Sequence, residues 1–111
     1  MGETGKQVVL ITTSSEDEAK SIATILVNER LAACVNVIPL VRSIYLWEGK
    51  LCDERETLLL AKTDAGCFDR LAKRVSEIHS YTTPEIISLS IDAGSEKYLE
   101  WIDDCVKEKR K

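Results

Sequence analysis

The side chains that most often carry protein chemistry are sparse in this chain of 111 residues. It has one histidine, His79, so a Ser–His–Asp or Cys–His centre would have to be built on that residue alone. His79 ends a helical pattern, and an imidazolium suits the negative end of a helix dipole, so a helix-terminal role is the alternative to a base or a ligand. The sequence contains no phosphate loop and no dinucleotide fingerprint. We therefore predict no catalytic centre and expect a protein that is not an enzyme.

The four cysteines, Cys34, Cys52, Cys67 and Cys105, are spread along the chain and form no C-x-x-C pair. This spacing is not typical of a zinc site or a dithiol redox site. The first residues show neither a secretory nor a myristoylation pattern, which predicts a cytoplasmic protein with free thiols. Cys34 lies in the apolar stretch LAACVNVI and is expected to be buried. Cys52 and Cys67 lie among polar residues and are candidates for exposed thiols, the alternative to the buried role expected of free cysteines.

The net charge argues against nucleic-acid partners, and the hydropathy argues against a membrane-spanning segment. The net charge is −4 and the sequence pI is about 5.0, whereas binding to a phosphate backbone requires a basic surface. No segment approaches the roughly 18 apolar residues that a membrane-spanning helix needs. We predict neither a nucleic-acid nor a membrane partner.

Apolar periodicity predicts alternating strands and helices. Strands are expected at 8–11, 33–47, 54–63 and 86–91, and helices at 15–31, at 64–79 and after a Ser95 cap. Ser15 and Glu18 form a capping box at the first helix. Pro39 interrupts the second strand and, because proline cannot donate to a sheet ladder, belongs on an edge strand or at a bulge. The turn at 48–50 predicts a long hairpin that projects beyond the domain.

This element order predicts an α+β protein with a ferredoxin-like βαββαβ sandwich and a C-terminal helix. Two helices on one side of a four-stranded sheet, joined by right-handed crossovers, place the first and third strands in the centre. We predict a single domain at 7–108 with flexible ends at 1–6 and 109–111. The third strand, ETLLLAK, lacks the aromatics of an RNA-recognition domain. The loop TTSS lacks both the C-x-x-C of a metal chaperone and the arginine and glycine of an acylphosphatase.

The predicted hairpin carries Tyr45 and Trp47, large side chains that a monomer rarely leaves in water. We therefore predict a homo-oligomer in which edge strands pair between subunits. The alternative is a monomer whose third helix folds back over these aromatics.

Five blocks of the sequence resemble the CutA family of divalent-cation tolerance proteins. They are ERLAACVNVIP, SIYLWEGKL, LLLAKT, HSYTTPEII and YLEWI, in this order from about Val8 to Trp101. The resemblance implies an intertwined homotrimer similar in form to the PII signalling proteins. It also implies a role in tolerance of copper and other divalent metals, with no cofactor required beyond a possible bound metal ion.

The resemblance also implies where copper would bind, and here the chain departs from the family. The family's proposed ligands are a cysteine near the end of the first strand and two adjacent histidines late in the second helix. The cysteine position falls on Ile11 and the first histidine position on Ile78, so His79 is the metal ligand that remains. One imidazole without a thiolate makes a poor copper site. A site built across the trimer from His79, Glu85 and other carboxylates is an alternative.

Further matching residues are candidates to line clefts between subunits; they are Tyr45, Trp47, Glu48, Lys62, Tyr81, Glu85 and Trp101. Some of these residues could instead serve packing between subunits. Lys62 and Glu85 are charged groups near an apolar interface, and such groups need partners, so we expect each to pair with the other or with a ligand. Two functions follow: a trimeric metal-tolerance protein, or a PII-like sensor or scaffold whose clefts take a small anion or a partner loop.

Overall fold

The computed structural model describes residues 4–107 of the chain. Its elements, in chain order, are β1 (Lys6–Thr13), α1 (Glu16–Asn28), β2 (Cys34–Trp47), β3 (Lys50–Asp64), the short 3₁₀ helix η1 (Ala65–Cys67), α2 (Phe68–Ile78), β4 (Ile86–Ser90) and α3 (Glu96–Val106). Part of the predicted N-terminal end belongs to the fold, because the Thr4 hydroxyl donates to the Ile91 carbonyl and Lys6 begins β1. The rest of the predicted ends, at 1–3 and 109–111, and residue 108 lie outside the described residues.

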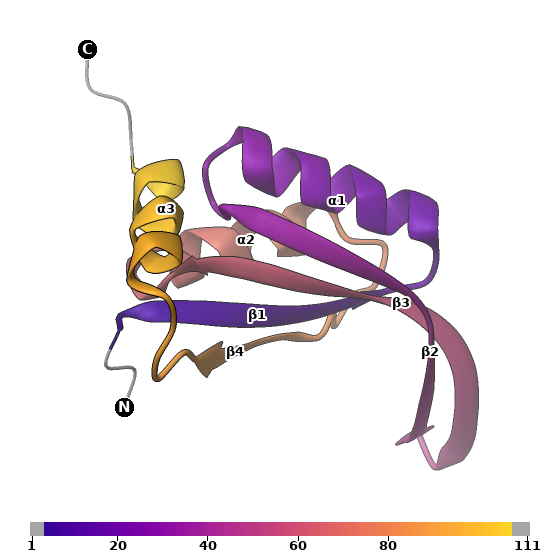
Figure 1. Cartoon of the computed structure of the whole chain (residues 1–111). Helices are drawn as coiled ribbons and strands as arrows, with labels where there is room; N and C mark the ends of the chain where they lie inside the picture. The colour runs from indigo at the N-terminus through magenta and orange to yellow at the C-terminus, as the bar shows by residue number, and fades with distance from the viewer. Residues whose placement is uncertain (1–3, 108–111) are drawn as a thin grey trace.

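The four strands form one antiparallel sheet in the order β2-β3-β1-β4, which confirms the predicted ferredoxin-like arrangement. β1 and β3 are central, and β2 and β4 are the edges. α1 and α2 lie on the same side of the sheet, above it in Figure 1. Their apolar side chains, Ile22 and Leu71 among them, pack on Val9, Ile11 and Leu59 of the central strands. Among residues 4–107, no helix lies on the other face of the sheet.

Both ends of α1 are closed by side chains and backbone bonds that the sequence specifies. Ser15 accepts a hydrogen bond from the Glu18 amide, as the capping box predicts. The helix ends at Asn28 rather than at the predicted Leu31, in a Schellman motif whose left-handed residue is Arg30 (φ 60°). The Leu31 amide bonds the Leu26 carbonyl at 2.9 Å, and both side chains enter the core. Leu31 therefore keeps the apolar pattern of the helix without being helical.

The β2–β3 hairpin extends away from the body of the molecule, at the lower right of Figure 1. Its two-residue turn, Glu48-Gly49, has positive φ at both positions, the geometry that suits the twist of paired strands. The ladder slips between Ile38 and Val41, so Pro39 lies at a bulge on an edge strand, as predicted. β3 begins at Lys50, four residues before the predicted 54. The residues from 50 to 53 lie outside the core, and no apolar pattern marks them.

α3 packs at the end of the sheet away from the hairpin, at the left of Figure 1. Ile102 and Val106 form a second small core there with Ala33 and Cys67. The α3 helix does not cover the hairpin aromatics, so a single chain does not adopt the alternative in which α3 folds back. Trp47 remains 53% exposed.

The cysteine expectations require two corrections. Cys67 is buried rather than exposed, because α3 covers the start of α2. Cys34 is only half-buried, because it starts an edge strand, and Cys52 is also half-buried. All four thiols are free. Among residues 4–107, no helix is long and apolar enough to cross a membrane.

Candidate functional site

His79 lies directly after α2, and its side chain has no exposed surface. Its Nε2 is 2.7 Å from the Thr12 carbonyl oxygen of β1, and its Nδ1 accepts a hydrogen bond from the Tyr81 amide at 3.0 Å. A carbonyl only accepts and an amide only donates, so the neutral ring carries its proton on Nε2. Both nitrogens are thus engaged within the protein.

Glu18, in the first turn of α1, holds the same loop. Its carboxylate accepts hydrogen bonds from the Ser80 amide (2.8 Å) and hydroxyl (3.1 Å) and lies 3.6 Å from His79 Nδ1. Burial acts to raise the pKa of Glu18, but the hydrogen bonds from Ser80, the proximity of the His79 ring and the backbone of Ser14 together outweigh it, so that pKa lies below its ordinary value of 4.5. Glu18 therefore stays ionised at neutral pH and anchors the loop that carries Tyr81.

A metal ion does not fit the ligand set of one chain. A metal at His79 would have to replace the hydrogen bond to Thr12 or the one to Tyr81. Ile11 is fully buried in the core and Ile78 packs against it, so neither family ligand position offers a donor. Within residues 4–107, no three His, Cys, Asp or Glu side chains gather as a metal site would require. We assign His79 a positioning role, and its role as a ligand stays a prediction.

Two tyrosines and two carboxylates form a cluster on the hairpin beside this loop. Tyr81 donates to Glu56 at 2.6 Å, and Tyr45 donates to Glu54 at 2.9 Å. Burial and the hydrogen bond to Glu56 raise the pKa of Tyr81 above its ordinary range. The hydrogen bond to Glu54 raises the pKa of Tyr45 to about 12. In this cluster both phenols remain protonated, and each donates a hydrogen bond to one of the two carboxylates.

A second group of candidate residues lies at the other end of the sheet. Lys62 pairs in register with Cys34 and donates to Asn36, and Trp101 of α3 lies against Tyr98 with ring centroids 5.4 Å apart. Burial, followed by the influence of the Cys34 and Cys105 thiols, raises the pKa of Tyr98. No ion pair joins Lys62 to Glu85 within the described residues.

The predicted cleft residues thus divide into two groups that a single chain does not bring together. Glu56 and Lys62 are six residues apart on β3, which is roughly 20 Å in a strand. Trp47 and Glu48 lie at the tip of the hairpin, and the exposed Glu85 precedes β4. A single chain in this conformation therefore does not form one site from both groups.

Sequence reasoning did not identify Glu54 and Glu56 as members of the site, and it assigned Glu18 only a capping role. Their partners, Tyr45, Tyr81 and Ser80, come from other elements, so no local motif indicates the contacts. Glu56 is only 8% exposed, yet it stands in a polar stretch of the sequence. The capping box located the Glu18 carboxylate but could not indicate that its oxygens face a loop more than 60 residues away.

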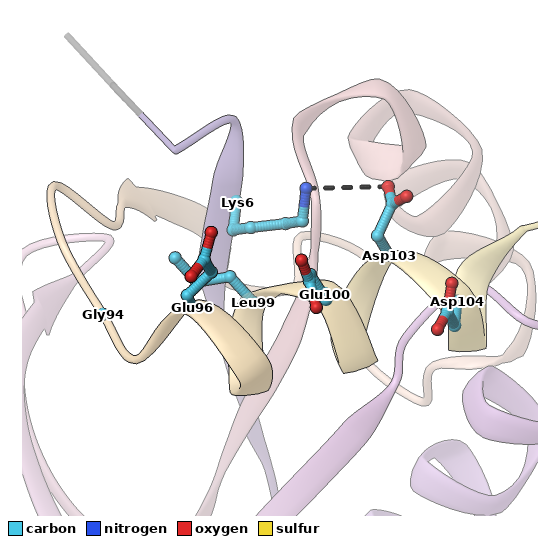
Figure 2. Close-up of a pocket in the computed structure, with 7 residues that line it drawn as sticks. All are labelled: Lys6, Gly94, Glu96, Leu99, Glu100, Asp103 and Asp104. Atoms are coloured by element: carbon cyan, nitrogen blue, oxygen red, sulfur yellow. Dashed lines mark ion pairs between the residues drawn. The ribbon is translucent and has the colours of Figure 1, made fainter.

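A hollow beside α3 is lined mainly by acidic side chains. Glu96, Glu100, Asp103 and Asp104 border it together with Lys6, and Figure 2 shows the ion pair between Lys6 and Asp103. Lys6 lies 3.2 Å from Asp64 and 3.6 Å from Asp103, and its side chain is 11% exposed. This lysine ties the start of β1 to α3 and to the end of β3. None of the predicted cleft residues lines this hollow.

The helix-free face of the sheet is apolar. Val9 and Ile11 point into the helix-covered core, so the alternating residues Val8 and Leu10 point the other way. Their register partners on β4, Leu89 and Ile87, are 55% and 50% exposed. The class of protein is therefore a ferredoxin-like α+β protein with a projecting hairpin and an apolar sheet face that no helix covers within the described residues.

Comparisons with known proteins identify the family. The model of the CutA1 divalent ion tolerance protein matches residues 7–105. The divalent-cation tolerance protein CutA of Thermus thermophilus is 50% identical over 97 residues, 87% of this chain and 94% of that protein. The chloroplastic protein CutA of Arabidopsis thaliana is 41% identical over 90% of this chain, which spans only 55% of that protein. This chain belongs to the CutA family of divalent-cation tolerance proteins.

Solved structures agree with this assignment. The Thermus thermophilus Cut A1 structure has a TM-score of 0.86 at 49% identity and covers 87% of this chain and 94% of its own. A CutA structure from Archaeoglobus fulgidus, described as a periplasmic divalent cation tolerance protein, has a TM-score of 0.90 at 38% identity. It covers 92% of this chain and 99% of its own. Relatives thus carry names from different compartments, and the cytoplasmic location of this chain stays a prediction.

Proposed function

We propose that this chain acts in tolerance of copper or other divalent metal ions as a homotrimer whose functional sites lie between subunits. The observation that carries the proposal is the division of the candidate residues. Tyr45 and Tyr81 lie near one end of β3, and Lys62 and Trp101 near the other. Contact between copies is the simplest way to bring the two groups into one cleft.

Apolar surface on both the sheet and the hairpin supports self-association. Ile87 and Leu89 are about half exposed, and Leu46 and Leu51 at the hairpin are 71% and 72% exposed. A monomer rarely leaves so many large apolar side chains exposed on a sheet face and a hairpin, whereas a symmetric oligomer covers them with copies of itself. Edge strand β2 offers a free row of backbone groups for pairing between subunits.

Mass and metal titration test the two parts of this proposal separately. Sedimentation equilibrium should give about three times the 12.4 kDa of one chain at micromolar concentration. A mass of one chain would contradict the trimer. Calorimetric titration of the assembled protein with Cu²⁺ and Zn²⁺ should show binding that is unchanged in His79→Ala if the ligands lie between subunits. Loss of binding in that variant would make His79 a ligand, and no measurable binding would argue for a role that does not involve direct metal contact.

The second candidate function is a PII-like sensor or scaffold whose clefts take a small anion or a partner loop. It is favoured by Lys62, a cation that meets the uncharged Asn36 rather than a carboxylate. An anion brought to the cleft would supply the opposite charge. A thermal-shift screen of small carboxylates and phosphates, repeated on Lys62→Ala, tests this function. A stabilising anion whose effect disappears in the variant would support it, and a uniformly flat screen would count against it.

A further inference from the structure

The bulge in β2 places Pro39 and Leu40 opposite a single residue of β3, Thr57, so β2 has one residue more than β3 at this point. Leu40 adopts a φ of 64°, a left-handed conformation that is strained for a residue with a branched side chain. Its side chain is 74% exposed, so the strain is not compensated by burial within residues 4–107. Backbone strain that is retained in this way is a reason to look for a function of the extra residue.

The faces of β3 follow a regular alternation, because β3 runs from Lys50 to Asp64 as one strand. Leu59 and Ala61 lie in the core under the helices, so Lys62 points to the helix-free face. Glu54 and Glu56 are separated from Lys62 by even numbers of residues and point the same way. One face of β3 therefore carries three of the charged groups of the candidate site.

The faces of β2 change at the bulge. Val35 packs against the helix-covered core, whereas Tyr45 donates to Glu54 at 2.9 Å on the helix-free face. Val35 and Tyr45 are separated by an even number of residues, so they would share a face in a regular strand. A regular continuation from Val35 would instead present Ile44 and Leu46 on the helix-free face, because a shift of one residue turns every side chain over.

We propose that the bulge at Pro39 and Leu40 is a positioning device that turns Tyr45 and Trp47 to the face of the sheet that carries Lys62. Before the bulge, β2 serves the core with its odd-numbered residues. After the bulge, the same parity serves the candidate cleft. One extra residue thus lets a single edge strand complete the core at one end and present aromatic side chains beside carboxylates at the other.

This role of the bulge deepens the proposed function and rests on it in part, because the face concerned carries candidate cleft residues from both groups. Tyr45 and Glu56 lie toward the hairpin, and Lys62 lies toward α3. A second copy packed on this face would contact both groups. The face of each side chain can be measured within one chain, so failure of the trimer and failure of the positioning role give different results.

Two variants make the ladder regular and differ in the face that they give to the hairpin. Deletion of Leu40 removes the extra residue, so Tyr45, Glu54 and Glu56 should stay on the helix-free face. A threonine inserted between Glu56 and Thr57 instead gives the extra residue a partner on β3. In that variant the hairpin side chains should turn to the opposite face, while both strands keep their register in the core.

The contact between Tyr81 and Glu56 reports the face, because Tyr81 belongs to the loop after α2 and reaches the hairpin from outside. A nuclear Overhauser effect between the Tyr81 ring and the Glu56 methylene protons should appear in the unmodified protein and in the deletion variant, and should be lost in the insertion variant. The bond between Tyr45 and Glu54 is local to the hairpin and should survive in both variants, so a Tyr45 pKa that stays at about 12 checks that the hairpin is formed.

The outcomes separate the face from the bend that a bulge also gives its strand. Loss of the Tyr81 contact in the deletion variant would overturn the proposal, because the bend and not the face would then place the hairpin. Retention of the contact in an insertion variant with a formed hairpin would overturn it as well. If the insertion variant does not fold, a retained contact in the deletion variant still supports the proposal, since a strand that is one residue shorter reaches the same face without a bulge.

Sedimentation equilibrium of the same proteins tests the connection with the proposed trimer. The deletion variant should keep the mass of the unmodified protein, and the insertion variant should fall to the mass of one chain. Leu40→Gly keeps the bulge and relieves its strain, so it should assemble normally and unfold at a higher temperature. Loss of assembly in Leu40→Gly would assign the role to the leucine side chain and contradict the proposal. An unmodified protein with the mass of one chain would count against the trimer alone, because the Tyr81 contact decides the role of the bulge.

Discussion

At the scale of the residue, the candidate site depends on carboxylates that keep phenols protonated. Tyr45 donates to Glu54, which raises the pKa of Tyr45, and Tyr81 donates to Glu56, where burial and then this hydrogen bond raise the pKa of Tyr81. A phenolate beside a carboxylate would place two negative charges within hydrogen-bond distance, which explains the direction of both shifts. The site therefore presents hydroxyl groups over the whole physiological range of pH.

Replacing Glu54 should restore an ordinary tyrosine. The pKa of Tyr45 is about 12 in the folded protein and about 10 in an unfolded chain, so the bond to Glu54 favours folding below pH 10 and ceases to do so as the pH rises toward 12. In Glu54→Gln, a phenol should ionise near pH 10, and the near-ultraviolet absorbance of tyrosinate measures this. Glu48→Gln, at the hairpin turn, is the control and should titrate as the unmodified protein does. Tyrosinate absorbance that appears at the same pH in all three proteins would contradict the assignment.

The residues of the site were only partly predictable. Tyr45 stood out because an aromatic on a projecting hairpin is costly to expose, Tyr81 because it lies in the block HSYTTPEII that resembles the family, and His79 because it is the only histidine. Glu54 and Glu56 did not, because their partners come from a neighbouring strand and a distant loop. The burial of His79 between β1 and α1 likewise results from tertiary packing, which no local sequence pattern indicates.

At the scale of the element, Arg30 joins the ends of two helices. It occupies the left-handed position of the Schellman motif after α1, where glycine is the usual residue. Its guanidinium donates to the Cys105 carbonyl in the last turn of α3 at 3.0 Å. A carbonyl in a last helical turn has no partner within its own helix, so Arg30 supplies one from outside. This contact explains why an arginine, and not a glycine, occupies a position whose backbone has positive φ.

Arg30→Gly should therefore relieve the backbone strain at the end of α1 and weaken the last turn of α3. Relief of the left-handed strain, roughly 1–2 kcal/mol, is offset by the entropy of glycine and by the lost hydrogen bond, each about 1 kcal/mol. The overall free energy of unfolding should change by less than about 1 kcal/mol. Hydrogen exchange in the last turn of α3 should rise several-fold, while α1 keeps its protection. Arg30→Lys keeps a donor and should behave as the unmodified protein, and equal exchange in α3 for both variants would contradict this account.

The elements themselves followed closely from the sequence, with errors that have physical causes. The sheet order, the bulge at Pro39 and the cap at Ser15 follow from strand chemistry, proline chemistry and the capping box. The end of α1 was placed too late because Leu31 packs back on Leu26 in the Schellman motif. The start of β3 was placed too late because the projecting hairpin needs no buried face, so its residues carry no core pattern.

At the scale of the whole molecule, α1 and α2 cover one face of the sheet, and no helix of residues 4–107 covers the other face. The helix side buries Val9, Ile11 and Leu59 completely. On the other side, β4 leaves Ile87 and Leu89 half exposed, and the hairpin extends away from the rest of residues 4–107. These features suit the homotrimer proposed above, in which further copies of the chain would cover the apolar face.

A charge placed on the uncovered face should therefore dissociate the proposed trimer without unfolding the single chain. Ile87 is half exposed in one chain, so Ile87→Lys should cost the isolated subunit no more than about 1–2 kcal/mol in apolar burial. In a packed interface the same lysine would be buried without a partner, which costs much more. Sedimentation equilibrium should show a mass near that of one chain, with the circular dichroism of the folded protein retained.

The neighbouring position on β4 provides the matched control. Ser88 is also exposed, but its side chain points to the opposite side of the strand, so Ser88→Lys adds the same charge away from the apolar face. This variant should keep the mass of the unmodified protein. If both variants stayed assembled, the subunits would have to associate through the hairpin or edge strands alone. If both dissociated equally, general charge repulsion would explain the result, and the apolar face would lose its role.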